Sequence, residues 1–123
     1  MPYEIDIAGP IWRVTYTGTL TSNELVKLFE ESYRLEHDLQ VVPSRICDLS
    51  RVQDIHLNFQ DMLGVANRRR EARFPNAFKS ALIAANPVQF GFARMFQTLN
   101  DNPQISIKIF STVEEGVAWI EQQ

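Results

Sequence analysis

The period of the hydrophobic residues changes repeatedly along the chain, and this restricts the fold more than any other feature of the sequence. In 11–17 and 105–109 apolar side chains occupy every second position, which is typical of strands with one covered face. Elsewhere they recur at three- and four-residue spacing, which predicts amphipathic helices. The predicted strands are 1–8, 11–17, 45–49, 79–85 and 105–109, and the predicted helices are 22–35, 59–73, 87–99 and 113–120.

Residues that begin or interrupt regular structure support these boundaries. Gly9-Pro10 separates the first two strands by a connection so short that it predicts an antiparallel hairpin. Thr21, Asn58, Asn86 and Thr112 each precede a predicted helix and carry the side-chain oxygen of an N-cap. Both threonines also have a glutamate three residues later, which is the spacing of a capping box.

The predicted order of elements is β-β-α-β-α-β-α-β-α, which indicates an α/β fold with right-handed crossovers. We expect a mostly parallel five-stranded sheet with an antiparallel N-terminal hairpin and four helices, in a single domain spanning 1–123. The alternation in 11–17 and 105–109 predicts that these strands have one less covered face. The continuous apolar run 81–85 predicts a strand buried on both faces in the middle of the sheet.

Composition and charge exclude several classes of protein. A chain of 123 residues that is 45% hydrophobic can bury a substantial core, which argues against disorder. Its 12 basic and 15 acidic side chains give a net charge of −3, which argues against nucleic-acid binding. One cysteine can form neither an internal disulfide nor a Cys-rich zinc site. The sequence shows no signal peptide and no run of about 18 apolar residues, so we expect a cytoplasmic protein without a transmembrane segment.

Two segments carry a family resemblance. They are 47–54, Cys-Asp-Leu-Ser-Arg-Val-Gln-Asp, and 109–120, an apolar strand followed by an acidic cap and an Ala-Trp-aliphatic helix. Together with the order of elements, they resemble the SpoIIAA-like (STAS-like) domains over nearly the whole chain. The resemblance implies a bacterial protein with the β/α superhelix of that family.

The resemblance does not include the segment that is phosphorylated in the signalling members of the family. Its signalling members are anti-sigma-factor antagonists with an Asp-Ser-Ser-Gly stretch, one serine of which is phosphorylated. The matching stretch here is Asp54-Ile55-His56-Leu57, which keeps the aspartate and lacks both serines and the glycine. The resemblance therefore implies an uncharacterised branch that shares the scaffold and lacks the switch.

Polar residues near the end of a central strand form one candidate site. Asp48 and Ser50 lie where ligands usually bind in open α/β sheets, and we expect Asp54 and His56 to join them from the following loop. Local turn chemistry explains Asp48 and Ser50 equally well, because both side chains bond nearby amides. No nucleophile–base pair and no set of three or four metal ligands is evident, so we predict neither a catalytic residue nor a metal site.

A run of arginines forms a second candidate site. Arg69 and Arg73 share a helical face, and Arg70 continues the predicted stripe of Phe59, Leu63 and Ala66. Guanidinium groups bind carboxylates and phosphates, so the cluster is a candidate patch for an anion or an acidic partner. Favourable interaction with the helix dipole is the alternative explanation.

Phe90 lies outside the main apolar stripe of its helix, beside Gly91, and is a candidate for an apolar pocket or an interface. Cys47 falls in a buried strand and is expected to act as a small hydrophobe.

We expect a non-enzymatic module without a cofactor that binds a protein partner and forms a homodimer. The alternative is a carrier of a small apolar or lipid-like ligand.

Overall fold

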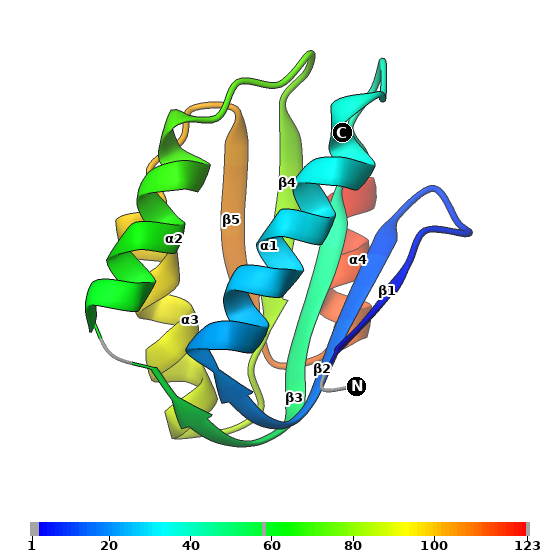
Figure 1. Cartoon of the computed structure of the whole chain (residues 1–123). Helices are drawn as coiled ribbons and strands as arrows, with labels where there is room; N and C mark the ends of the chain where they lie inside the picture. Colours follow the sequence, from blue (N-terminus) through cyan, green and yellow to red (C-terminus); the bar gives the residue numbers. More distant parts are fainter. Residues whose placement is uncertain (1–2, 58, 123) are drawn as a thin grey trace.

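The computed structural model describes residues 3–57 and 59–122, and within them it contains five strands and four helices (Figure 1). The strands are β1 (Tyr3–Asp6), β2 (Trp12–Thr21), β3 (Arg45–His56), β4 (Phe78–Ile83) and β5 (Ile105–Phe110). The helices are α1 (Ser22–His37), α2 (Phe59–Glu71), α3 (Pro87–Leu99) and α4 (Val113–Glu121).

The strands form one sheet in the order β1-β2-β3-β4-β5. β1 pairs antiparallel with β2, and the pairs β2–β3, β3–β4 and β4–β5 are parallel. Each parallel pair is joined by one helix, as a crossover requires. The predicted α/β architecture with an antiparallel N-terminal hairpin is confirmed.

The helices are divided unequally between the two faces of the sheet. α1, α2 and α3 cover one face, and α4 alone covers the other (Figure 1). Leu25, Met62 and Phe92 from the three helices pack with Leu49 and Leu82 of the sheet in the larger core. The smaller core places α4 on the opposite faces of β3 and β4.

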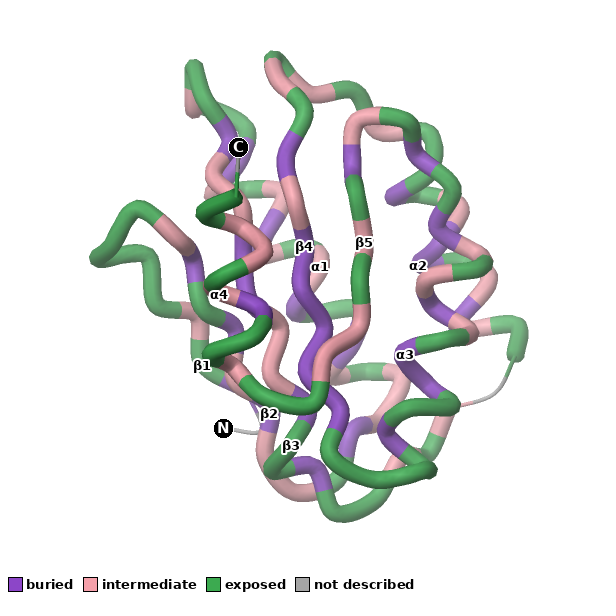
Figure 2. Tube along the Cα trace, turned by 180° about the vertical axis from the view of Figure 1, so that it is seen from behind, coloured by how far each residue is buried: buried purple, intermediate pink, exposed green. Residues whose placement is uncertain are grey.

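This division explains the pattern of apolar residues along the strands. All of β4 from Ser80 to Ile83 is buried, as the continuous apolar run predicts (Figure 2). In β2, Val14 and Tyr16 are buried under the helices, whereas Arg13 on the other face is exposed, because α4 does not extend to β2. The less covered face predicted from alternation is therefore confirmed.

Two strands run beyond their predicted ends, β2 to Thr21 and β3 to His56. Gly18 adopts a φ of 70°, and the β2–β3 register shifts on either side of Thr17–Gly18, so the pairing continues through bulges. The extended part of β3 has no β4 residue beside it. Instead, the Gln89 side chain of α3 donates to the Val52 carbonyl oxygen at 2.9 Å. Tertiary contacts therefore replace the turn expected after residue 49.

The buried stripe of α2 is also different from the predicted one. Met62, Val65, Ala66 and Arg69 are buried, whereas Phe59 is exposed. Of the predicted stripe, Ala66 is buried and Leu63 is half-buried, because the buried face of α2 packs on α1 and α3 as well as over the sheet. In α3, Val88 lies four residues before the buried Phe92 and is nevertheless exposed.

Three of the four predicted N-caps are confirmed. The side chains of Thr21, Asn86 and Thr112 accept hydrogen bonds from the amides of Glu24, Gln89 and Glu115 respectively. Thr112 and Glu115 form a complete capping box. The fourth predicted cap, Asn58, and the first two residues of the predicted strand 1–8 lie outside the described residues.

Gly116 holds α4 against the sheet. A Cβ at this position would lie 3.0 Å from Cδ1 of Ile46 and 3.1 Å from both Cβ of Ala81 and Cδ1 of Ile83. Gly91, on the exposed side of α3, has no such neighbour within 4 Å. The two glycines therefore differ in packing although both are helical.

We expect Gly116→Ala to destabilise the fold by about 1–3 kcal/mol, because the added methyl overpacks the smaller core. Gly91→Ala should instead stabilise it by about 0.5–1 kcal/mol through helix propensity. Urea unfolding of both variants measures the difference. A stabilised Gly116→Ala would contradict the close approach of α4.

Candidate functional site

The polar residues at the end of the central strand do not form one cluster. Oδ1 of Asp48 accepts from the backbone N of Ser50 at 2.9 Å and from its Oγ at 2.6 Å, at a register shift between β2 and β3. Asp54 and His56 lie on β3 itself and not on a loop, so the expected placement is wrong. His56 lies eight positions after Asp48 along the same strand, which in a fully extended strand is a distance of roughly 26 Å. Local backbone chemistry accounts for Asp48 and Ser50.

The arginine cluster is also divided. Arg70 and Arg73 are exposed: Arg70 donates to Oδ1 of Asn67 at 2.6 Å, and Arg73 donates to the carbonyl oxygen of Glu71 at 3.1 Å. Arg69 is only 4% exposed and points into the protein. The predicted surface pairing of Arg69 with Arg73 is therefore wrong. Arg69 turns inward because an internal carboxylate binds it.

That carboxylate is Glu36, near the end of α1, and it binds two arginines. Arg69 of α2 donates from Nη1 and Nη2 to its two oxygens at 3.0 and 3.2 Å. Arg45, the first residue of β3, donates from Nη1 to Oε2 at 2.5 Å. All three side chains are buried, so this triad connects α1, α2 and β3 inside the protein.

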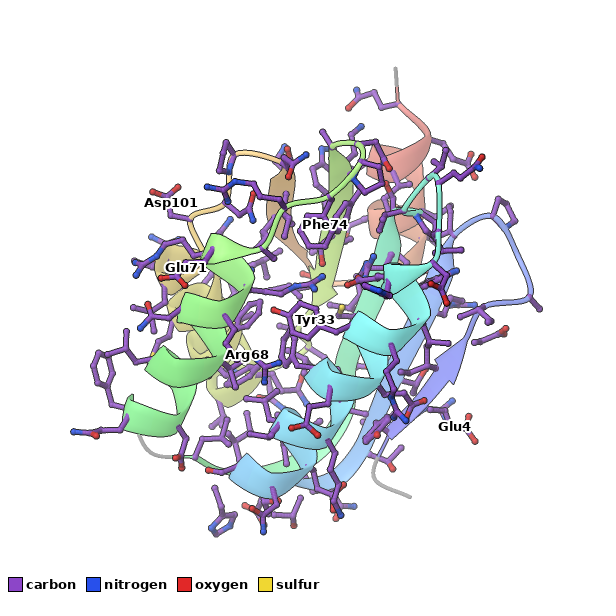
Figure 3. The ribbon with its side chains drawn as sticks, turned by 45° about the horizontal axis from the view of Figure 1, so that its top comes forward. Glu4, Tyr33, Arg68, Glu71, Phe74 and Asp101 are labelled. Atoms are coloured by element: carbon purple, nitrogen blue, oxygen red, sulfur yellow. The ribbon has the colours of Figure 1, made fainter. Side chains whose placement is uncertain are left out.

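Aromatic rings surround both guanidinium groups. Cζ of Arg45 lies 5.2 Å from the ring centre of Trp12 and 4.6 Å from that of Phe78. Cζ of Arg69 lies 5.3 Å from the ring centre of Tyr33 and 5.2 Å from that of Phe74, two residues that lie between α1 and α2 in Figure 3. Ring faces attract cations, so this surrounding stabilises charge that water does not reach.

Glu36 compensates the charges of the two arginines to different extents. Burial by itself would raise the pKa of Glu36, but the hydrogen bonds and charge of Arg69, and then Arg45, lower it below its ordinary value. Burial lowers the pKa of Arg45, Glu36 opposes that shift, and the charge of Arg69 adds to it. Burial also acts to lower the pKa of Arg69, but its bidentate bond to Glu36 outweighs burial and raises it. Arg45 is therefore the less compensated cation of the two.

A cavity of about 50 Å³ adjoins this triad between the sheet and helices α1–α3. Its lining includes the polar side chains Arg45, Arg69 and Asn100 and apolar side chains such as Leu82 and Phe96. Two of these residues each have one buried polar atom without a hydrogen-bond partner in the described part of the chain, namely Nε of Arg45 and Oδ1 of Asn100.

Cys47 also lines the cavity. Burial raises the pKa of its thiol, and its sulfur lies 3.9 Å from Oγ of Ser80. Asp61, in the first turn of α2, accepts a hydrogen bond from Oγ of Ser22. Among residues 3–57 and 59–122, no group of three His, Cys, Asp or Glu side chains is placed to hold a metal ion.

The sequence analysis missed Glu36 and Arg45 and placed Arg69 on the surface. A signal was present, because Glu36 lies four residues after Ser32 and so continues the buried face of α1. Arg69 continues the buried stripe of α2 in the same way, with the opposite charge. Two opposite charges at buried helical positions indicate an internal ion pair.

Phe90 is placed as predicted, outside the buried stripe of α3. It is 47% exposed, and its neighbour Val88 is 65% exposed. Val88 borders a groove of about 240 Å³ between α3 and the extended part of β3, where Val52 and Ile55 lie. This apolar surface is the other candidate site.

Comparison with known proteins identifies the fold. No protein-family model and no curated protein matches the sequence. An uncharacterised protein of the DUF3478 family from Shewanella loihica PV-4, which has a SpoIIAA-like fold, is similar in structure with a TM-score of 0.62 and 13% identity, covering 96% of this chain and 91% of that one. The unphosphorylated anti-sigma factor antagonist SpoIIAA has a TM-score of 0.56 and 11% identity, covering 98% and 99%. The chain therefore has the SpoIIAA-like fold, as the resemblance implied.

We expect Glu36→Gln to destabilise the protein by about 3–5 kcal/mol, because it leaves two buried guanidinium groups without a counter-charge. Glu30→Gln, at an exposed position of the same helix, is the matched control and should change stability by less than about 0.5 kcal/mol. Urea unfolding at neutral pH measures both. Equal stabilities of the two variants would contradict the importance of the triad.

The lowered pKa of Glu36 also predicts a dependence on pH. Its contribution to the free energy of unfolding is fully present above its ordinary pKa of 4.5 and is lost as the pH falls through its lower folded value. The stability difference between wild type and Glu36→Gln should therefore shrink below about pH 4.5. A difference that stays constant from pH 7 to pH 3 would show that the carboxylate charge does not contribute.

Proposed function

We propose that this SpoIIAA-like domain is a non-enzymatic regulatory or binding module that acts through contact with protein. The proposal rests mainly on three exposed apolar side chains, Phe59, Val88 and Phe90, which are 58%, 65% and 47% exposed. These residues belong to the first turns of α2 and α3, at the edge where the parallel strands end. Large exposed apolar side chains that gather in one region are typical of interaction sites.

The groove beside Val88 extends this surface toward β3. Val52 and Ile55 line its other side, and Ile55 lies within the stretch that corresponds to the serine-containing segment of the signalling relatives. Because this chain has Ile55-His56 where those relatives carry serines, we infer that binding here is not switched by phosphorylation of that segment. An apolar surface of this kind binds its partner without a prior modification.

The same surface suits a homodimer. On the face of α4, the part of the sheet near β1 and β2 is polar, with exposed Arg13 and half-buried Thr15, so it offers little apolar area to a second copy. The groove and the exposed side chains Val88 and Phe90 offer more. We therefore propose that a second copy of the chain binds at this edge of the sheet.

The alternative role as a carrier is supported by the interior cavity. Its volume of about 50 Å³ is well below the roughly 150 Å³ of a cavity that holds benzene. This size favours a ligand of a few atoms over a lipid chain.

No helix in the described ranges has the length and apolar character needed to span a bilayer.

The double variant Val88→Asp, Phe90→Asp tests the contact surface. Light scattering coupled to size exclusion should give a dimer for the wild type and a 14.2 kDa monomer for the variant, because charge at the surface prevents its burial. Val41→Asp is the matched control, since Val41 is 69% exposed just before β3, at the opposite edge of the sheet.

A wild-type chain that remains a 14.2 kDa species at high concentration would remove the homodimer. Binding of another protein would then be tested by comparing the proteins that wild type, the double variant and Val41→Asp retain from native extract. If all three retain the same proteins, the surface is not the contact site.

A further inference from the structure

We propose that the interior cavity between the sheet and helices α1–α3 binds a small carboxylate, whose charged group is held by Arg45. This site is separate from the surface proposed for protein contact, and neither proposal depends on the other. The triad and the cavity beside it supply three independent observations. These are an unpartnered donor, an excess of positive charge and a lining that is apolar away from the charge.

The unpartnered donor is Nε of Arg45. Its Nη1 and Nη2 are occupied by Glu36 and by the Pro43 carbonyl oxygen, the latter at 3.2 Å. Nε is buried, has no partner in residues 3–57 or 59–122, and belongs to a residue that lines the cavity. Buried polar groups in proteins are almost always hydrogen-bonded, so an unmet donor beside a cavity indicates a ligand or an ordered water.

The charge distinguishes an anion from a water molecule. Arg45 and Arg69 share the single carboxylate of Glu36, so the triad keeps one positive charge in excess. Cys47 does not balance it, because burial raises the pKa of the thiol and keeps it neutral at pH 7. An excess buried charge is unfavourable unless an opposite charge compensates it. A carboxylate supplies that charge, and its oxygens fit a guanidinium N–H.

The rest of the lining limits the size and character of the ligand. Ser80 and Asn100 add polar groups near the triad, and Asn100 has an unpartnered Oδ1. Leu28, Leu82 and Phe96 provide apolar walls. A volume of about 50 Å³ fits a few heavy atoms, since one water needs roughly 10–15 Å³ on the same scale. The ligand class that fits is therefore a short-chain monocarboxylate such as acetate or propionate.

The test uses the full chain and two readouts at constant ionic strength. Acetate and propionate should raise the thermal unfolding midpoint by an amount that grows with the logarithm of their concentration, and they should shift the NMR signal of the Arg45 Nε–H until the site is saturated. Acetamide, which has a similar shape and no charge, should do neither. Octanoate should bind at least tenfold more weakly than propionate, because its chain exceeds the cavity.

Two variants locate the effect. Arg45→Gln removes the excess cation and keeps the pair of Glu36 and Arg69, so acetate should bind at least tenfold more weakly. Arg70→Gln is the matched control, because Arg70 is exposed and away from the triad, and it should bind acetate like the wild type. If Arg45→Gln does not fold, the Nε–H signal of the wild type still decides the question.

Three results would overturn the proposal. The first is an unchanged Arg45 Nε–H signal in saturating acetate and propionate. The second is an equal response to acetamide, which would assign the cavity to water or neutral solutes. The third is an equal response to chloride at the same concentration, which would reduce the effect to general anion binding. None of these depends on the oligomeric state, so the protein-contact proposal stands or fails separately.

Discussion

The carboxylate of Glu36 is the point on which the arrangement of the helices depends. It joins the last turn of α1, the first residue of β3 and the last turn of α2 through Arg45 and Arg69. α2 packs on α1 and α3 as well as over the sheet, and this internal ion pair adds a polar contact that holds its last turn. Buried charge is costly, and the surrounding rings, such as Phe78 and Tyr33, reduce that cost.

The two ends of the layer beneath the helices have different chemistry. The end near the start of β3, β4 and β5 holds the charged triad and the cavity, with apolar walls beyond it. The opposite end, where the strands finish, presents the exposed side chains Phe59, Val88 and Phe90. The two proposed binding sites therefore lie at opposite ends of this layer. The polar residues Asp48 and Ser50 between them serve the backbone of β3.

Much of the fold was predictable from local patterns. The hairpin, the alternation of strand and helix, the caps at Asn86 and Thr112 and the buried strand β4 follow from periodicity and from side chains that bond nearby amides. The ends of β2 and β3 were not predictable in this way. Gly18 and Gln89 extend those strands through a bulge and a side-chain bond from another element, and neither interaction is local in sequence.

The candidate sites were also predictable only where they depend on residues close in sequence. The sequence by itself determined the order of elements, the parallel sheet and the exposed position of Phe90, because each depends on residues a few positions apart. Only the tertiary structure decided that Glu36, Arg45 and Arg69 meet, since 33 residues separate Glu36 from Arg69. When a charged residue falls on the apolar face of a helix, its side chain either reaches solvent or pairs with an opposite charge inside the protein. Pairing requires that the fold brings an opposite charge within hydrogen-bonding distance.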